Sequence, residues 1–167
     1  MAERRNAKVL ELTGDYLPDR ALVGGKAWSI CRMKSLGLPV PPAFVVTTNV
    51  CQDYLNFREL PDALKDEVLV AVRGLEGTTG RYLGGEERPL LLSVRSGAPI
   101  SMPGMMDTVL NLGMSLEVQK ALAVESGSEK FAKDTHLRFL TLYSNIVLKQ
   151  SIAEDVEPEI IIQSLNS

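Results

Sequence analysis

The chain has 167 residues, the size of one ordinary domain, and 45% of them are hydrophobic. Charged residues make up 23%, which excludes the composition of a largely disordered chain. The formal net charge of -3 argues against a general nucleic-acid binder, because affinity for a phosphate backbone requires a concentrated basic surface. We therefore expect one folded core that binds phosphate locally, if at all.

Targeting and metal signals are weak. The apolar run near the start is short and is interrupted by Glu11, so no signal peptide is expected. No stretch approaches the roughly 20 apolar residues of a membrane span. Cys31 and Cys51 lack a second CxxC or a histidine cluster, which argues against a zinc site and a disulfide framework. The sequence predicts a cytoplasmic protein that binds neither membranes nor nucleic acid.

The first half of the chain alternates strands and helices, separated by glycine and proline. Proline lacks an amide donor and moves the residue before it out of the helical region, so residues 38–42 cannot be helical. The predicted elements are a strand at 8–12, a loop at 14–20, a helix from Gly24-Gly25 to Leu36, a strand at 43–47, a short helix capped by Thr48 or Asn49 and running through Tyr54, and a helix from Pro61-Asp62 to Leu75.

The second half begins with glycine-rich and charged residues and ends in two helices. The predicted elements are a loop at 74–85, a buried strand at 90–94, a structured loop at 96–113, and helices at 116–123 and 129–150. The order of strands and helices indicates an α/β or α+β fold.

Gly24-Gly25-Lys26 is the first candidate site. Two glycines let a backbone approach a ligand closely, and a helix that begins there directs free amides and a positive dipole outward. Lys26 would add a full charge to this anion site. The alternative is a solvated lysine beside a glycine turn, since the pattern matches no P-loop.

Arg95 is the second candidate, at the end of the apolar strand. Its planar guanidinium suits two oxygens of a phosphate and stays charged when partly desolvated. A structural salt bridge to an acidic neighbour explains the position equally well.

The third candidate is a loop in which a tight glycine turn adjoins a carboxylate and a hydroxyl. Such a loop could close over a nucleotide, with its methionines excluding water, although methionines also fill cores. Its residues are Ser101, Met102, Pro103, Gly104, Met105, Met106, Asp107 and Thr108.

His136 is the only histidine, and it lies inside the last predicted helix. A helical histidine without nearby serine, cysteine or aspartate signals is expected to be a packing or surface residue. No catalytic residue and no metal ligand is assigned from the sequence.

Taken together, three segments resemble the N-terminal nucleotide-binding region of pyruvate phosphate dikinase over about residues 8 to 150. The third segment, with its methionines and glycines, points to this branch rather than to the related phosphoenolpyruvate synthases and glucan dikinases. The first segment is Val23-Gly24-Gly25-Lys26-Ala27, the second runs from Leu36 to Phe44, and the third combines Leu92–Ala98 with Ser101–Gly113.

The resemblance implies the N-terminal portion of an ATP-grasp-like domain that uses ATP with Mg²⁺. The implied reaction interconverts ATP, phosphate and pyruvate with AMP, diphosphate and phosphoenolpyruvate through a phosphohistidine. By position, Lys26 and Arg95 match family residues that contact ATP phosphates, and the Ser101–Thr108 loop matches the loop that covers them. Most metal ligands are expected outside this chain, together with the second nucleotide-binding half, the phosphohistidine domain and the pyruvate domain.

The sequence also departs from the family pattern. Ala27-Trp28-Ser29-Ile30 replaces a smaller, glycine-containing stretch after the lysine. His136-Leu137-Arg138 replaces a more usual Tyr-Arg-Arg, and Arg138 is retained as a binding candidate.

We expect residues 1–152 to form the dikinase-like ATP-binding subdomain and 153–167 an acidic and apolar tail. On this interpretation the chain is a segment of a larger phosphotransferase and is inactive alone. The alternatives are a standalone, non-enzymatic half-domain that binds a nucleotide or a protein partner, and a truncated reading frame without function.

Overall fold

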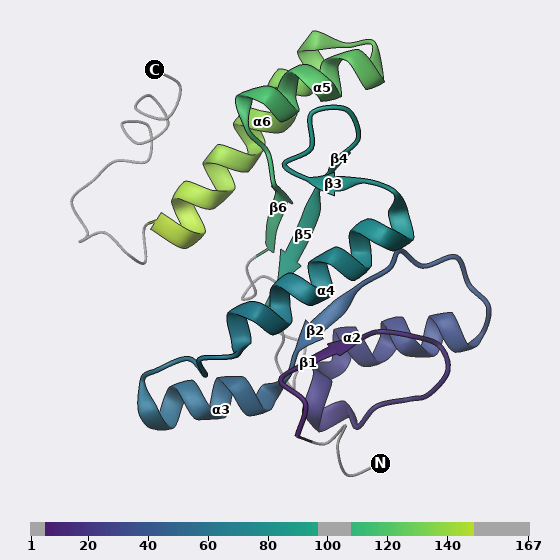
Figure 1. Cartoon of the computed structure of the whole chain (residues 1–167), viewed down its shortest axis with the longest axis vertical. Coiled ribbons are helices and arrows are strands. Elements are labelled where there is room, and N and C mark those ends of the chain that lie inside the picture. Colours follow the sequence, from purple (N-terminus) through teal and green to yellow (C-terminus); the bar gives the residue numbers. More distant parts are fainter. Residues whose placement is uncertain (1–5, 97–107, 149–167) are drawn as a thin grey trace. The chain divides into compact units, whose positions relative to one another are not determined.

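The computed structural model describes residues 6–96 and 108–148, which fold into two compact units (Figure 1). The described part of the first unit is residues 6–79, and that of the second is 80–96 and 108–148. Both combine helices and strands, so the described residues have the predicted mixed α+β character.

The first unit is built around a short antiparallel strand pair and the helix between its strands. β1 pairs with β2 in the register Val9↔Val46, Leu10↔Val45 and Glu11↔Phe44. Its elements are β1 (Val9–Glu11), α2 (Arg20–Ser35), β2 (Phe44–Val46), α3 (Thr48–Phe57) and α4 (Leu64–Thr79).

The core of this unit forms where the inward face of α2 meets β1. Leu12 and Cys31 are almost fully buried. Burial raises the pKa of the Cys31 thiol, which fits a packing role. The core cluster is Leu10, Leu12, Val23, Ala27 and Cys31.

Polar contacts fix the loops of this unit to its elements. The Thr47 hydroxyl donates to the Ala7 carbonyl at 2.8 Å, and Lys34 Nζ donates to the Leu12 carbonyl at 2.7 Å. A side chain at Gly14 would lie 2.8 Å from the backbone carbonyl carbon of Lys34, so only glycine permits this close approach. These contacts hold the C-terminal turn of α2 against the segment after β1.

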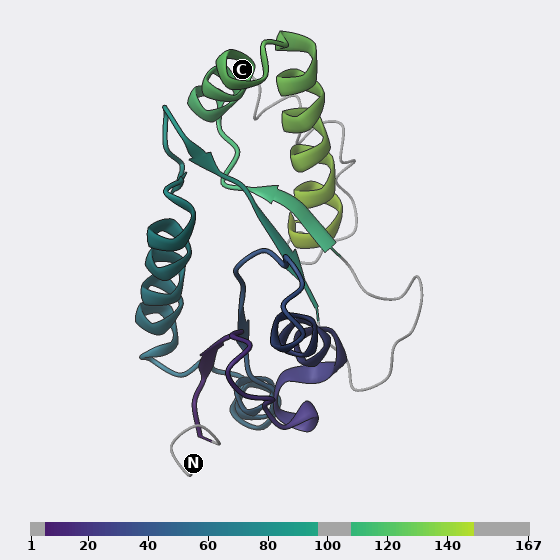
Figure 2. The same ribbon diagram turned by 90° about the vertical axis from the view of Figure 1, so that its right-hand side faces the viewer.

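The second unit joins two strand pairs to a helical hairpin. β3 and β4 pair in parallel, whereas β5 and β6 pair antiparallel. In Figure 2, α5 and α6 form a hairpin, and α6 runs alongside the β5–β6 pair, packing mainly on β6. The elements are β3 (Tyr82–Leu83), β4 (Pro89–Leu90), β5 (Leu92–Arg95), β6 (Thr108–Leu112), α5 (Leu116–Ser126), α6 (Glu129–Tyr143) and a π-helix, η1 (Ser144–Leu148).

Serine caps explain where the two helices of the hairpin begin. The Ser115 hydroxyl accepts from the Val118 amide, and the Ser128 hydroxyl accepts from the Phe131 amide, each at 3.2 Å. Each cap satisfies one of the amides that lack an intrahelical partner. The predicted starts at 116 and 129 are therefore confirmed.

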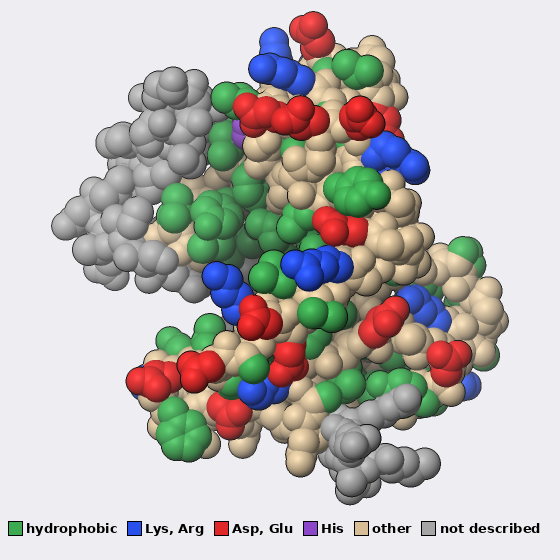
Figure 3. Space-filling model, in the orientation of Figure 1, with side chains coloured by type: hydrophobic (Ala, Val, Ile, Leu, Met, Phe, Trp, Pro, Cys, Tyr) green, Lys and Arg blue, Asp and Glu red, His purple; other side chains and the backbone are tan. Residues whose placement is uncertain are grey.

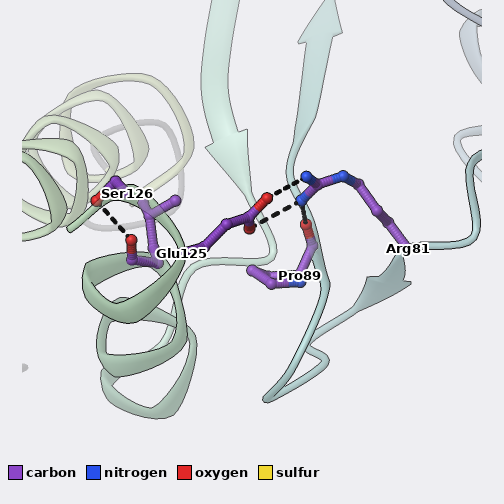
Figure 4. A network of polar contacts seen from close by, with 5 residues as sticks. Arg81, Pro89, Glu125 and Ser126 are labelled. Carbon is purple, nitrogen blue, oxygen red and sulfur yellow. Dashed lines mark hydrogen bonds and ion pairs between the residues drawn. The ribbon is translucent and has the colours of Figure 1, made fainter.

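An ion pair links α5 to the segment around β3 and β4 (Figure 4). The Arg81 guanidinium binds both carboxylate oxygens of Glu125 and also donates to the Pro89 carbonyl at 3.1 Å. This contact raises the pKa of Arg81 and lowers that of Glu125. Two segments 44 residues apart in sequence are thereby joined.

Three predicted boundaries in the first unit, including the one at the end of the unit, need correction. α2 begins at Arg20 rather than at Gly24, and α3 is capped at Thr47 rather than at Thr48 or Asn49. The loop expected from residue 74 begins only at Gly80, because α4 continues to Thr79. Buried Val72 and Leu75 anchor that helix, so packing outweighs the low helix propensity of its glycines.

Two predictions in the second unit were wrong. The strand expected at 90–94 is divided between β4 and β5, and β5 is largely exposed, with Val94 49% accessible. The loop expected at 96–113 contains β6, whose pairing with β5 is a non-local contact that local composition does not reveal.

Candidate functional site

Gly24 interrupts α2 with a backbone conformation that only glycine adopts readily. Its φ of 80° and ψ of 165° are non-helical and split the helix into a short first turn and a longer second part. The predicted helix start at Gly24-Gly25 therefore corresponds to the second part of α2. The structure adds one turn before it.

The break creates the local features of an anion site. A helix that restarts after Gly24 has first-turn amides without intrahelical acceptors and the positive end of a peptide dipole. The Ser29 hydroxyl donates to the Gly25 carbonyl at 2.9 Å, which shows that the helical turn is re-established there. Lys26, the residue after the two glycines, is exposed.

The core fixes the orientation of this turn. Val23 and Ala27 are buried on either side of the glycines, whereas Lys26 lies on the exposed face. Lys26 and its buried neighbour Ala27 therefore lie on different faces of the helix that restarts after Gly24.

Arg20 is a neighbour of this turn that sequence reasoning missed. Its guanidinium carbon lies 5.9 Å from the centroid of the Trp28 ring. A side chain at Gly25 would lie 3.4 Å from Arg20 Nη2, so the guanidinium also adjoins the glycine. The available signal was the unusual tryptophan after the lysine, but its partner became visible only with the helix break in place.

Arg95 and Thr108 are brought together in the second unit. They are directly opposite each other in the antiparallel ladder between β5 and β6. Opposed residues of such a pair project from the same face, with Cβ atoms about 5 Å apart. The structure thus joins the second candidate to the last residue of the third.

The structural alternative for Arg95 was a salt bridge. Arg95 is exposed, and in residues 6–96 and 108–148 no carboxylate forms an ion pair with it. Its guanidinium is therefore not occupied by a described acidic neighbour. Both its exposure and its place at a strand end leave it accessible to an anion.

The rest of the third candidate, Ser101 to Asp107, lies outside the described residues. Lys26, Gly24 and Gly25 belong to the first unit, whereas Arg95, Thr108 and Arg138 belong to the second.

Arg138 and His136 lie two residues apart on α6 and have different environments. Arg138 is exposed, and His136 is 6% accessible with Nδ1 2.8 Å from Gln119 Oε1 on α5. Burial lowers the pKa of His136, favouring the neutral ring. The packing role expected for His136 is confirmed.

The candidate residues lie on a surface of mixed charge. Lys and Arg are interspersed with Asp and Glu on the face shown in Figure 3. Within the described part of the chain, no group of three or more His, Cys, Asp or Glu residues could hold a metal ion. In the same residues, no helix is both long and apolar enough to cross a membrane.

Comparisons with known proteins point to one family. Residues 20–68 match a family model described as pyruvate phosphate dikinase, AMP/ATP-binding domain. The matched stretch begins at Arg20 and includes Gly24, Gly25 and Lys26.

Curated relatives extend the similarity across most of the chain. The chain is 52% identical over 127 residues to pyruvate, phosphate dikinase 2 of Oryza sativa subsp. japonica. It is 46% identical over 131 residues to the pyruvate, phosphate dikinases of Entamoeba histolytica and of Rhizobium meliloti. These alignments cover 76–78% of the chain but only 14–15% of each relative. The predicted resemblance to pyruvate phosphate dikinases is thus confirmed, and the chain spans about one seventh of their length.

Proposed function

We propose that this chain is the ATP-binding part of a pyruvate phosphate dikinase-like phosphotransferase. The observation that carries the proposal is the glycine break at Gly24, with exposed Lys26 next to it, inside the stretch that matches an AMP/ATP-binding family model. A phosphate seated at this turn would meet backbone amides and an ammonium group together.

The chemistry of these groups suits the phosphate end of ATP. Phosphoryl transfer depends mainly on positioning and charge neutralisation, which amides, lysine and arginine supply without covalent chemistry. Arg95 and Thr108 add a guanidinium and a hydroxyl on one face of the β5–β6 pair. We assign them, with Arg138 and the Ser101–Asp107 segment, to phosphate binding as well.

The amide, lysine and arginine donors fit phosphate, and the described residues contain no cluster of metal ligands. Mg²⁺ bound to ATP would neutralise phosphate charge, and we assign its protein ligands to parts of the enzyme beyond these residues. The ATP-grasp-like character of the complete domain and a cytoplasmic location belong to the same proposal.

The whole reaction would convert ATP, phosphate and pyruvate to AMP, diphosphate and phosphoenolpyruvate. We propose that the second nucleotide half, the phosphohistidine domain and the pyruvate domain are supplied by the rest of a longer enzyme, as the length of the relatives suggests. This chain would hold and orient phosphates and would be inactive alone.

Calorimetry of the isolated chain with Mg·ATP tests whether tight ATP binding requires the rest of the enzyme. We expect weak or absent binding, because half of the nucleotide clamp lies elsewhere, and micromolar affinity would contradict the proposal. Lys26→Gln in the complete protein should lower affinity for ATP about tenfold by removing a charged phosphate contact.

The mass of the native protein in its source cell, measured with an antibody to this chain, distinguishes the proposal from a standalone half-domain. A band several times larger than 18.3 kDa is expected. A band at 18.3 kDa would contradict the proposed enzyme and favour a half-domain that binds a nucleotide or a partner. For such a half-domain, Arg95→Ala should leave partner binding intact.

A further inference from the structure

Trp28 departs from the pattern of the resembled family and is not explained by the glycine-lysine turn itself. It is half-buried and packs against the core cluster of the first unit. Its ring is also the surface on which the Arg20 guanidinium rests, 5.9 Å from the ring centroid. The unusual residue therefore has one face toward the core and a cationic neighbour.

The same guanidinium lies beside the helix break. A Cβ at Gly25 would lie 3.4 Å from Arg20 Nη2 and 3.7 Å from Nε, the two nitrogens along one edge of the fork. Arg20 lies before the break and Gly25 after it, so the side chain bridges the break from its N-terminal side. These are van der Waals distances, so the guanidinium lies directly beside position 25.

The N–H groups of Arg20 are not occupied by a described carboxylate. Among residues 6–96 and 108–148, neither ion pair involves Arg20. Its neighbour Asp19 instead accepts from the Ala21 amide at 2.9 Å as the helix cap. A guanidinium that lies over an aromatic ring keeps its N–H donors in its own plane, where they can still bind a ligand.

We propose that Arg20 is a further phosphate-binding residue, and that Trp28 is the positioning residue that holds it beside Gly25. The inference rests on the proposed phosphate site at Gly24, Gly25 and Lys26 and assigns two flanking cations to it. Arg20 would bind two oxygens of a di- or triphosphate through one edge of its fork, while Lys26 acts as a point charge.

A titration of the full 167-residue chain with inorganic triphosphate, followed by NMR, tests the assignment. NMR detects millimolar binding, so the weak affinity expected of this chain does not prevent the measurement. The signals are the amides of residues 24–27 and the Nε–H of Arg20. Trp28 is the only tryptophan, so its fluorescence reports independently on the stacked guanidinium.

Arg20→Gln should weaken triphosphate binding about fivefold, the loss of one charge-assisted contact at an exposed site. Arg32→Gln is the matched control, since it removes the same charge from the last turn of α2 and should change binding less than twofold. Trp28→Phe should keep the fold and part of the stacking, whereas Trp28→Leu should weaken binding and shift the Arg20 Nε–H signal. Equal affinities for Arg20→Gln and Arg32→Gln would overturn the inference.

Lys26→Gln separates this inference from the proposed function. If Lys26→Gln weakens binding and Arg20→Gln behaves like the control, the glycine-lysine site stands and the role of Arg20 is rejected. If Arg20→Gln alone weakens binding, Arg20 binds anions but the assigned role of Lys26 fails. If triphosphate leaves all these signals unchanged, the role of Arg20 is rejected, whereas the proposed function, which allows absent binding by the isolated chain, is not.

Discussion

Gly24 in the first unit and Gly113 in the second both have positive φ angles, 80° and 103°, but they meet different surroundings. A Cβ at Gly24 would have no atom outside its chain neighbours within 4 Å. A Cβ at Gly113 would lie 2.5 Å from Leu83 Cδ1 and 3.0 Å from the Leu90 carbonyl oxygen. One glycine provides a backbone conformation next to open space, and the other allows β6 to approach β3 and β4. The first glycine is required for its backbone conformation, whereas the second is also required for packing.

The largest effect on stability is expected for Gly113→Ala. Backbone strain adds to a collision with Leu83, so the free energy of unfolding of the second unit should fall by about 3 kcal/mol or more. Urea unfolding followed by amide hydrogen exchange in the second unit measures it. Gly127→Ala is the control, because φ is 68° there but the space is open, and it should cost about 1 kcal/mol. Equal losses for the two variants would contradict the packing argument.

Gly24→Ala should have an intermediate effect on stability and a large one on phosphate binding. Strain alone predicts a loss of about 1–3 kcal/mol in the first unit, read from amide exchange of the α2 core residues. Gly74→Ala, in the regular interior of α4 with open space around it, should instead stabilise the same unit by about 0.5–1 kcal/mol. An unstrained Gly24→Ala variant that binds triphosphate normally would show that the break is not required.

The smallest effect is a pH dependence confined to the second unit. The unfolded chain protonates His136 near its ordinary pKa of 6.5, whereas burial in the folded unit moves protonation to lower pH. Stability from the neutral ring is therefore complete above pH 6.5 and is lost as the pH falls through the folded pKa. Unfolding free energies measured between about pH 7.5 and about pH 5.5 should decline less in His136→Gln. Parallel declines in both proteins would exclude His136 as the cause.

The sequence predicted correctly those features of the fold that depend on neighbouring residues. Ser115 and Ser128 precede helices that bind their hydroxyls, and the prolines of residues 38–42 exclude a helix there. The glycine-lysine turn was likewise predicted, because Gly24 needs a conformation that few other residues adopt.

The missed features depend on residues distant in sequence. β6 forms because Thr108–Leu112 pairs with β5, which the methionines, prolines and glycines between them conceal. Arg20 lies beside Gly25 across the break at Gly24, an arrangement that the sequence pattern does not reveal. Val94 was expected to be buried from its composition, but α6 packs mainly on β6 and leaves it exposed.

The π-helical turn at Ser144–Leu148 has a consequence for the helical phase of the segment. Each residue of an α-helix advances the side-chain direction by about 100°, and a π turn contains one residue more than the α repeat. Buried Ser144, whose hydroxyl has no hydrogen-bond partner among the described residues, marks the point of the change. Side chains after it are displaced by one position from the apolar stripe of α6. We therefore expect deletion of exposed Asn145 to restore, for Ile146 and Val147, the helical phase that begins at Glu129.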